Sequence, residues 1–336
     1  MDFQAFLKSS AQKIQKILPS LFLKDLPSNS KLKKILKNLQ SNTKGGKYIR
    51  GSLIRLGYML IKNEENKNIL TVASSYEILH TSLLIHDDII DKSILRRGRK
   101  SLWKVVGQNL AICLGDVGFF LTNKIIAESK FQPYLKTEAL SVLNKTILNT
   151  FYGEMLDVAI SENRKTKRLE KEVLLIHKLK TASYSISGPL LIGAILAGAD
   201  KKMLDNINLF GENLGIAFQI QDDILGTFGN ESEVGKSVTS DIEENKNTLL
   251  IIYALLTGTK EQKNFLKTHY GTKEISSIDH KHIKRIFEDT GALAYSEKKA
   301  KFYAGNARKN IDKITDNKRY QKILNQLVDF TLNRQK

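Results

Sequence analysis

The chain has 336 residues, of which 41% are hydrophobic and 26% are charged, as in an ordinary soluble globular protein. Its formal net charge of +18 comes mostly from lysines scattered along helical patterns, which favours a solubilising surface over a nucleic-acid footprint. Cys113 is the only cysteine, so an internal disulfide is excluded and a reducing compartment is expected.

Neither the start of the chain nor its longest apolar stretch predicts export or a membrane span. The first ten residues, MDFQAFLKSS, lack the basic region and apolar run of a secretory signal. The apolar stretch at residues 186–198 is too short to cross a bilayer and contains Pro189, so we expect a core helix there. The sequence therefore predicts a cytoplasmic protein with no transmembrane segment.

The periodicity of apolar residues predicts an all-α protein. Apolar residues recur three and four positions apart in many windows, strand-like alternation is nearly absent, and only four prolines interrupt the chain. The predicted helices, in chain order, cover residues 69–91, 138–160, 170–184 and 203–225, and helical periodicity continues through 260–334. Residues 226–247 are polar and glycine-bearing and predict a mobile loop. Since no repeat or linker divides the chain, we expect one domain over residues 1–336.

The sequence HDDIID, at residues 86–91, places Asp87, Asp88 and Asp91 at the end of an apolar helix pattern. On a helix Asp87 and Asp91 are neighbours, and His80 lies two turns earlier on nearly the same line. Converging carboxylates repel one another unless a cation neutralises them, and Mg²⁺ typically binds one or two carboxylates together with substrate phosphates. The motif indicates a magnesium site, although alone it leaves a solvated helix end open.

A second motif, FQIQDDILG at residues 218–226, repeats this construction. Gln219, Asp222, Asp223 and Gly226 fall on one helical face. Helix bundles build metal sites from side chains on facing helices, so the two aspartate pairs could face each other across a bundle. Each motif alone would fit a solvated helix end equally well, but the occurrence of both favours a functional site.

Basic residues beside these motifs are candidates for binding phosphate, because guanidinium and ammonium groups are strong partners of phosphate oxygens. Most would be surface residues if taken singly, but Lys180 lies in an apolar helix pattern and requires a partner. Besides Lys180, the basic candidates lie near an aspartate pair, a glycine pair or the polar loop: Lys47, Arg50, Arg96, Arg97, Lys236 and Lys246.

The order of the motifs GGKxxR, ExxHxSLxxHDDxxD, RRG, GDxxF, GExLD, KTAxY, FQxQDDxLG and DIxExKxTL resembles the trans-isoprenyl diphosphate synthases, or polyprenyl synthetases, over roughly residues 43–250. The short-chain geranylgeranyl and farnesyl diphosphate synthases are the most similar branch. The resemblance implies an all-α bundle of the isoprenoid synthase type with a central substrate cavity, usually a homodimer. It also implies a prenyltransferase that condenses isopentenyl diphosphate with dimethylallyl, geranyl or farnesyl diphosphate and binds about three Mg²⁺ ions with the diphosphate.

Carried over by position, the resemblance assigns a role to each motif residue. The ligands of magnesium on the allylic diphosphate would be Asp87, Asp88 and Asp91, and those of a further ion Asp222 and Asp223. The residues that bind isopentenyl diphosphate would be Lys47, Arg50, His80 and Arg97. The contacts to the allylic diphosphate would be Arg96, Lys180, Thr181, Gln219, Lys236 and Lys246. Lys180 and the five aspartates would be the catalytic residues.

Two departures from the family pattern bear on these assignments. Tyr48 and Gly51 stand where many members have arginine and proline, although the inferred phosphate contacts remain. Gly226 stands where many members have a third aspartate, so the third ligand of the second motif is missing. Asp241 is the candidate to replace it.

Product length would be set on the helix below Asp87. Leu83, Leu79 and Tyr76 share roughly one face, and at 1.5 Å rise per residue a growing chain would meet Leu83 after ~6 Å and Tyr76 after ~16 Å. Ser82 occupies a position where many short-chain members carry an aromatic residue, which argues against the shortest products. These residues predict a geranylgeranyl product, with longer chains or farnesyl diphosphate as the alternative.

Other classes explain less of the sequence. A terpene cyclase would carry a different second motif, and a non-catalytic subunit would have lost an aspartate cluster. A basic helical nucleic-acid-binding module would explain the +18 charge but not acidic clusters within apolar helices. The segment DHKHIKR at residues 279–285 could bind a metal through its histidines, but an exposed loop is the favoured interpretation.

Overall fold

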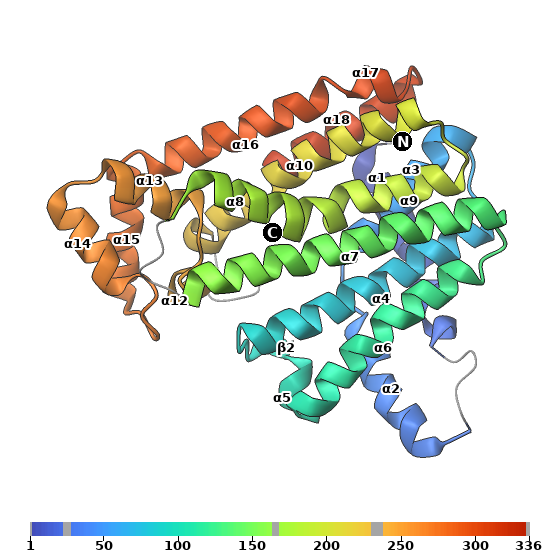
Figure 1. The fold of residues 1–336 in the computed structure, drawn as a ribbon, viewed down its shortest axis with the longest axis horizontal. Helices are drawn as coiled ribbons and strands as arrows, with labels where there is room; N and C mark the ends of the chain where they lie inside the picture. Colours follow the sequence, from blue (N-terminus) through green and yellow to red (C-terminus); the bar gives the residue numbers. More distant parts are fainter. Residues whose placement is uncertain (1, 23–27, 163–167, 230–237, 334–336) are drawn as a thin grey trace. The chain divides into compact units, whose positions relative to one another are not determined.

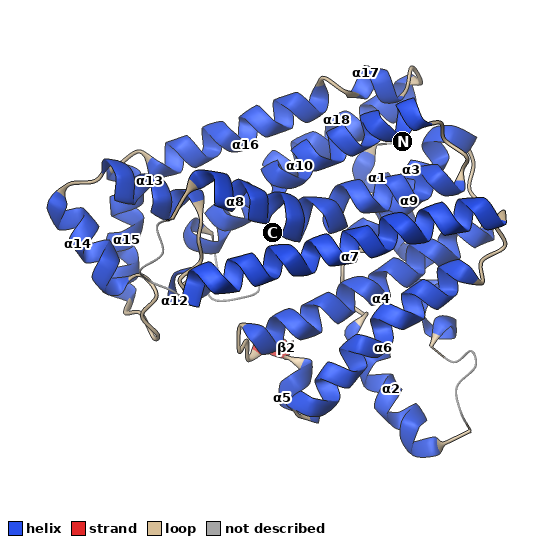
Figure 2. Ribbon diagram, viewed as in Figure 1, coloured by secondary structure: helices blue, strands red, loops and turns tan. Residues whose placement is uncertain are grey.

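The computed structural model describes residues 2–22, 28–162, 168–229 and 238–333 (Figure 1). Apart from one two-stranded hairpin, the regular elements of these residues are all helices, which confirms the predicted all-α class (Figure 2). The chain forms two compact units. Unit 1 consists of the residues up to Lys145 together with Ser185–Asn208 and Ile311–Gln326. Unit 2 consists of Thr146–Tyr184, Leu209–Asn310 and the residues from Leu327 onward.

Unit 1 is built on pairs of packed helices, with α3 against α9 and α4 against α6. Its complete elements are α1 (Phe3–Leu21), α2 (Ser30–Asn42), α3 (Ile49–Lys62), α4 (Lys67–Ile90), β1 (Leu95–Arg96), β2 (Arg99–Lys100), α5 (Leu102–Val106), α6 (Gln108–Ala127), α9 (Gly188–Leu196) and α17 (Ile311–Ile314). The Asn66 side chain accepts a hydrogen bond from the Ile69 amide at 3.0 Å and so caps α4. The apolar face of α4 then packs into the core, where Val72, Tyr76 and Leu79 are fully buried.

Unit 2 packs α13 against α16 and holds shorter helices around them. Its complete elements are α8 (Glu170–Ile176), α12 (Ser240–Glu243), α13 (Leu249–Thr257), α14 (Lys260–His269), α15 (Ser277–Asp289) and α16 (Ala292–Arg308). One of its core clusters gathers Ile251, Leu266, Tyr270, Ile283 and Phe287, each buried, from α13 to α15. The elements that contribute residues to both units are α7 (Pro133–Glu162), the π-helical segment η1 (His177–Ser187), α10 (Lys201–Phe228) and α18 (Lys318–Leu332).

The predicted helices agree with the structure except at their ends. The predictions at 69–91, 138–160 and 203–225 correspond to α4, α7 and α10, and 170–184 corresponds to α8 continued by η1. The prediction of an exposed loop at 279–285 is wrong, because these residues lie within α15. His280 is buried there, and its ring nitrogen Nε2 lies 3.2 Å from the Thr227 carbonyl oxygen. The predicted loop at 226–247 is interrupted as well: α10 continues to Phe228 and α12 begins at Ser240.

Within the part of the chain that the structure describes, two segments are apolar enough and long enough to cross a membrane, judged by length and composition alone. Glu170–Leu196 is 78% buried within the protein, as expected for core helices, and it contains all but the last two residues of the core helix predicted at 186–198. Gln108–Ala127, which is α6, is only 33% buried and therefore presents much of its apolar surface outside the fold.

Close packing of α3 against α9 depends on glycine. A Cβ added at Gly193 would collide with the carbonyl oxygen of Ile54, and a Cβ at Gly57 would collide with that of Leu190. The two helices therefore approach backbone to backbone, and neither obstructing atom can move without moving a helix.

We expect Gly193→Ala to lower the free energy of unfolding by about 1–3 kcal/mol, because the added methyl forces α3 and α9 apart. Gly305→Ala is the matched control: Gly305 lies inside α16 with no atom within 4 Å of the added Cβ, so this change should stabilise by about 0.5–1 kcal/mol. Urea unfolding of both variants measures the difference. Equal stability of Gly193→Ala and the wild type would show that the helices are not in this contact.

Candidate active site

The first aspartate cluster lies at the end of α4 in unit 1, and two of its carboxylates contact the guanidinium of Arg96. Asp87 and Asp88 occupy the last turn, and Asp91 is the C-terminal cap residue. The Arg96 guanidinium lies against both carboxylates, with Nε donating to Asp88 Oδ1 at 2.8 Å and Nη2 lying 3.2 Å from Asp87 Oδ2. Burial opposes the charge of Arg96, but the adjacent carboxylates raise its pKa above the ordinary value. Burial also raises the pKa of Asp88, and Arg96 counters that rise.

A tight hairpin returns Arg96 to these aspartates. Strands β1 and β2 pair antiparallel, and the connecting residues Arg97 and Gly98 both have positive φ, at 53° and 71°. A two-residue hairpin loop with a type I′ turn requires a positive φ at both residues. The positive φ of Arg97 is strained, because Arg97 carries a side chain. Ser101 Oγ and Trp103 Nε1 both donate to the Ser93 carbonyl, at 2.6 and 2.8 Å, and so anchor the hairpin.

Three of the four residues predicted to bind isopentenyl diphosphate, Arg50, His80 and Arg97, lie together in unit 1. Arg50 Nη1 is 3.2 Å from His80 Nε2, and the Arg97 guanidinium lies against Gly46 and donates to the Lys44 carbonyl at 3.3 Å. Burial, together with the positive charges of Arg50 and Arg97, holds the pKa of His80 well below its usual value. His80 is therefore neutral, with Nε2 free of a proton to accept from Arg50. Lys47, the fourth predicted residue, is exposed and lies three residues before Arg50 in the chain.

Glu77 was not singled out from the sequence, although it lies one turn before His80. Its buried carboxylate accepts a hydrogen bond from the Gly51 amide at 2.7 Å, in the first turn of α3. A carboxylate is stabilising at a helix N-terminus, although burial raises the pKa of Glu77. This contact also explains Gly51: a proline there would have no N–H to donate, and a Cβ would approach within 2.5 Å of the Ala73 carbonyl oxygen.

The second aspartate cluster, in unit 2, is a chain of hydrogen bonds. Thr181 Oγ1 donates to Gln219 Oε1 at 2.5 Å, and Gln219 Nε2 donates to Asp223 Oδ1 at 2.8 Å. The other oxygen of Asp223 is 3.0 Å from Nε2 of His177, and both side chains are buried. Asp222 precedes Asp223 on α10 and is half-buried. Sequence reasoning missed His177, whose only local signal was a histidine in the apolar pattern LLIHKLK.

Lys180 has the partners that its apolar surroundings required. Its ammonium nitrogen lies 2.6 Å from Glu154 and 2.9 Å from Asp157, the acidic residues of the GEMLD motif on α7. The π-helical segment that carries Lys180 packs closely on both sides: a Cβ at Gly153 of α7 would meet the Lys180 backbone, and one at Gly215 of α10 would meet Ala182. Irregular helical turns of this kind are frequent at functional sites.

The missing third aspartate of the second motif has a structural counterpart. A Cβ at Gly226 would collide with Oδ2 of Asp241, so the Asp241 carboxylate lies where a side chain at 226 would begin. Asp241 is buried, and Lys246 Nζ lies 3.0 Å from its Oδ1 and 3.2 Å from Glu244. The structure thus brings together Asp241, Gly226 and Lys246. Lys236 lies outside the described residues.

The donor set fits a hard divalent cation bound together with an anion. Among the described residues, no group of three or more His, Cys, Asp and Glu side chains is arranged to hold a metal ion by itself. Instead, carboxylates are paired with cations at Arg96, Lys180 and Lys246. A magnesium–diphosphate complex offers positive charge to the carboxylates and negative charge to the cations, so it can replace these pairs without leaving an isolated charge.

The residues predicted to limit product length are all buried on α4: Tyr76, Leu79, Ser82 and Leu83. Ser82 faces α6, since a Cβ at Gly118 would collide with its Oγ. Its small size therefore has a packing reason in the close approach of α4 and α6. Leu83 and Tyr76 remain the candidates for limiting the length of the product.

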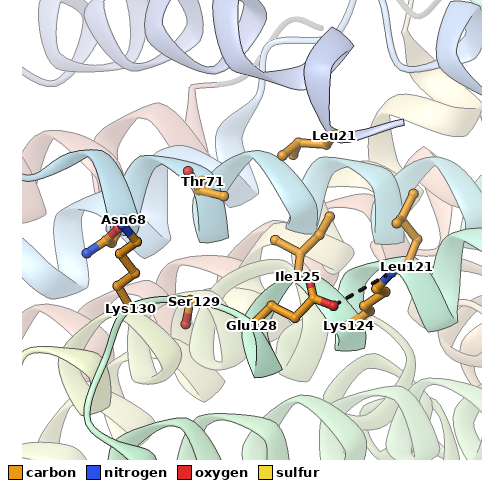
Figure 3. Close-up of a pocket in the computed structure, with 9 residues that line it drawn as sticks. All are labelled: Leu21, Asn68, Thr71, Leu121, Lys124, Ile125, Glu128, Ser129 and Lys130. Carbon is orange, nitrogen blue, oxygen red and sulfur yellow. Dashed lines mark ion pairs between the residues drawn. The ribbon is translucent and has the colours of Figure 1, made fainter. Parts of the chain in front are cut away.

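A separate pocket of about 180 Å³ lies at the other end of α4 (Figure 3). Leu121 and Ile125 of α6 and Leu21 of α1 provide its apolar lining, and Lys124 and Glu128 form an ion pair at 3.6 Å on its rim. Its α4 residues, Asn68 and Thr71, are at least 16 positions before Asp87, or ~24 Å along the helix axis. It is therefore distinct from the aspartate cluster.

Comparison with known proteins agrees with this chemistry. Residues 32–290 match the polyprenyl synthetase family. The chain is 33% identical to a geranylgeranyl diphosphate synthase of Saccharolobus solfataricus, with 88% of each chain covered. It is 34% identical to a geranylfarnesyl diphosphate synthase of Aeropyrum pernix, with 87% of this chain and 91% of that one covered.

The fold has close counterparts among solved structures. A geranylgeranyl pyrophosphate synthase from Corynebacterium glutamicum, complexed with isoprenyl diphosphate and magnesium, superimposes with a TM-score of 0.91 at 24% identity and covers 99% of this chain and 100% of that one. The helical fold is thus that of the isoprenyl diphosphate synthases. The chain belongs to the polyprenyl synthetase family and is a polyprenyl diphosphate synthase, a prenyltransferase.

Because the pKa of His80 is depressed in the folded chain, its protonation favours unfolding. Above the unfolded pKa of about 6.5 neither state binds the proton, and below it only the unfolded state does. We therefore expect stability to fall as pH drops through about 6.5, with His80 contributing up to ~1.4 kcal/mol per pH unit. Urea unfolding of the wild type and His80→Gln between about pH 7.5 and 5.5 isolates this slope. Parallel stability curves would contradict a neutral, buried His80.

Proposed function

We propose that this trans-prenyl diphosphate synthase condenses isopentenyl diphosphate with an allylic diphosphate to give geranylgeranyl diphosphate. The observation that carries the proposal is the convergence of Asp87 and Asp88 on Arg96, with Arg50, His80 and Arg97 gathered nearby in the same unit. This arrangement offers carboxylates to a metal and cations to phosphates, the two requirements of a metal-dependent transfer from a diphosphate.

The proposed roles are those that the family resemblance implies, and each agrees with the chemistry of the residue. The magnesium ligands are Asp87, Asp88 and Asp91 in the first cluster and Asp222, Asp223 and Asp241 in the second. Lys47, Arg50, His80 and Arg97 bind isopentenyl diphosphate. Arg96, Lys180, Thr181, Gln219, Lys236 and Lys246 bind the allylic diphosphate. When bound, magnesium supplies charge neutralisation on the leaving diphosphate.

The difficult step is heterolysis of the allylic carbon–oxygen bond, in which the electron pair leaves with the diphosphate. Arg96 is positioned to stabilise the growing negative charge, because its guanidinium lies beside the carboxylates that hold the metal. The double bond of isopentenyl diphosphate then supplies two electrons to the allylic carbon, and a proton is lost to the departed diphosphate. His80 orients the isopentenyl diphosphate and, because burial depresses its pKa, is a weak competitor for that proton. Apolar walls exclude water from the cation.

Asp87→Asn keeps the shape of the side chain and removes its charge. We expect at least a ~100-fold loss of turnover, comparable to loss of another charge-stabilising group. The control is Asp200→Asn: Asp200 is an exposed residue that accepts from the Met203 amide at the start of α10, and asparagine caps a helix equally well. Product formation from isopentenyl and farnesyl diphosphates is measured at saturating magnesium. Near wild-type turnover of Asp87→Asn there is incompatible with the proposed role.

Product length is proposed from the residues below Asp87. A chain extending along α4 meets Leu83 after ~6 Å and Tyr76 after ~16 Å, and Tyr76 is fully buried. The relatives carry names that span 20- and 25-carbon products, so longer chains are the second candidate. A farnesyl product is the third, and Leu83 is the residue that would favour it.

Tyr76→Ala removes the proposed floor, and we expect products longer than those of the wild type by at least one isoprene unit. The control is Tyr320→Ala, which truncates another buried tyrosine of unit 1, on α18, and should leave product length unchanged. Chromatography of the dephosphorylated products gives the chain lengths. If Tyr76→Ala retains the wild-type distribution, the floor lies elsewhere.

We further propose a cytoplasmic homodimer formed through α6. This helix is the less buried of the two long apolar segments, and it exposes Val117 at 41% and Phe120 at 77%. An exposed apolar helix face is unfavourable in water, and a second copy of the same face can cover it.

A further inference from the structure

The turn that follows α12, at Asn245 and Lys246, is shaped by contacts from distant parts of unit 2. Asn245 has a left-handed backbone with φ of 58°, and its side-chain amide donates to the Ser161 carbonyl at 2.6 Å. The Tyr270 hydroxyl donates to the Lys246 carbonyl at 2.8 Å. The Gly271 amide donates to the Ile242 carbonyl, also at 2.8 Å. Such a turn depends on its surroundings, because a left-handed asparagine is intrinsically unfavourable.

Arg168 makes the largest set of contacts with this turn. Its Nη1 donates to the Lys246 carbonyl at 3.1 Å, and its Nη2 donates to the carbonyl of Asn245 at 3.4 Å and to the side-chain oxygen of the same residue. The guanidinium also lies 5.4 Å from the centre of the Tyr270 ring. The planar fork of a guanidinium can satisfy several acceptors at once in one fixed geometry, which a lysine ammonium cannot.

The turn carries groups of the candidate site. The Lys246 side chain reaches Asp241 at 3.0 Å, and the Asp241 carboxylate fills the space above Gly226. A displacement of the Asn245–Lys246 backbone would therefore move the Lys246 ammonium relative to Asp241. Arg168 itself is bound to backbone carbonyls of the turn, so its effect on the site passes through the position of Lys246.

We propose that Arg168 is a positioning residue for the second aspartate cluster, holding the Asn245–Lys246 turn so that Lys246 is presented to the allylic diphosphate. This inference rests on the proposed role of Lys246. A residue that only stabilises the fold would lower the folded fraction without changing the properties of the folded enzyme. A positioning residue changes the affinity for the allylic diphosphate in the molecules that are folded.

A double-mutant cycle separates these two roles. We expect Arg168→Ala to raise the KM for the allylic diphosphate about 10- to 100-fold, with little change in the KM for isopentenyl diphosphate. Arg168→Lys should recover only part of the affinity, and added guanidinium ion at low concentration should recover part of the loss in Arg168→Ala. In a Lys246→Ala background the Arg168→Ala substitution should have no further effect on this KM, because it acts through Lys246. Any effect on melting temperature should persist in that background.

Arg308→Lys is the matched control, since Arg308 forms an exposed ion pair with Asp329 in the same unit and should change no kinetic constant. Calorimetric titration with inorganic diphosphate and Mg²⁺ gives the same comparison without turnover, so a failure of the proposed reaction is distinguishable from a failure of this inference. The inference is overturned if Arg168→Ala has wild-type affinity per folded molecule, or if its effect on affinity is equally large without Lys246.

Discussion

Carboxylates and cations neutralise one another at both candidate sites, and this pairing is the constraint on which the remaining chemistry depends. Asp87 and Asp88 converge on Arg96, Glu154 and Asp157 on Lys180, and Asp241 and Glu244 on Lys246. A half-buried carboxylate pair without a cation would be protonated or unfold its helix end. The internal pairs therefore keep these groups charged and ordered. Under the proposed function, a metal ion would take the place of the cation and a diphosphate the place of the carboxylates.

Close backbone contacts set the positions of these charged groups. Glycines at 153 and 215 admit the π-helical segment that carries Lys180, and Gly51 supplies the amide that the Glu77 carboxylate requires. None of these glycines has a side chain that could bind a ligand. Their effect is to bring polar side chains of neighbouring helices within hydrogen-bond distance, which a larger residue would prevent.

Helical periodicity was sufficient to predict the fold class, the long helices and the shared face of Asp87 and Asp91, because these depend on residues close together in the sequence. It also predicted that Lys180 needs a partner, but not that Glu154 and Asp157 supply it. The contacts of His177 with Asp223 and of Arg168 with Lys246 join segments far apart in the chain, and no local pattern specifies them. The segment at 279–285 was misread as a loop because polarity alone does not distinguish a loop from an exposed helix face.

The carboxylate above Gly226 has a consequence for how this site tolerates change. In an aspartate-rich helix motif all ligands belong to one rigid rod, and their spacing is fixed by the helix. The carboxylate beside Gly226 belongs to α12, a helix of four residues, so its position is set by tertiary contacts rather than by the geometry of α10. A Cβ at Gly226 would lie 2.0 Å from Oδ2 of Asp241, so a side chain at 226 requires the Asp241 carboxylate to shift. A substitution at position 226 therefore acts on Asp241, and this links two residues that no common element connects.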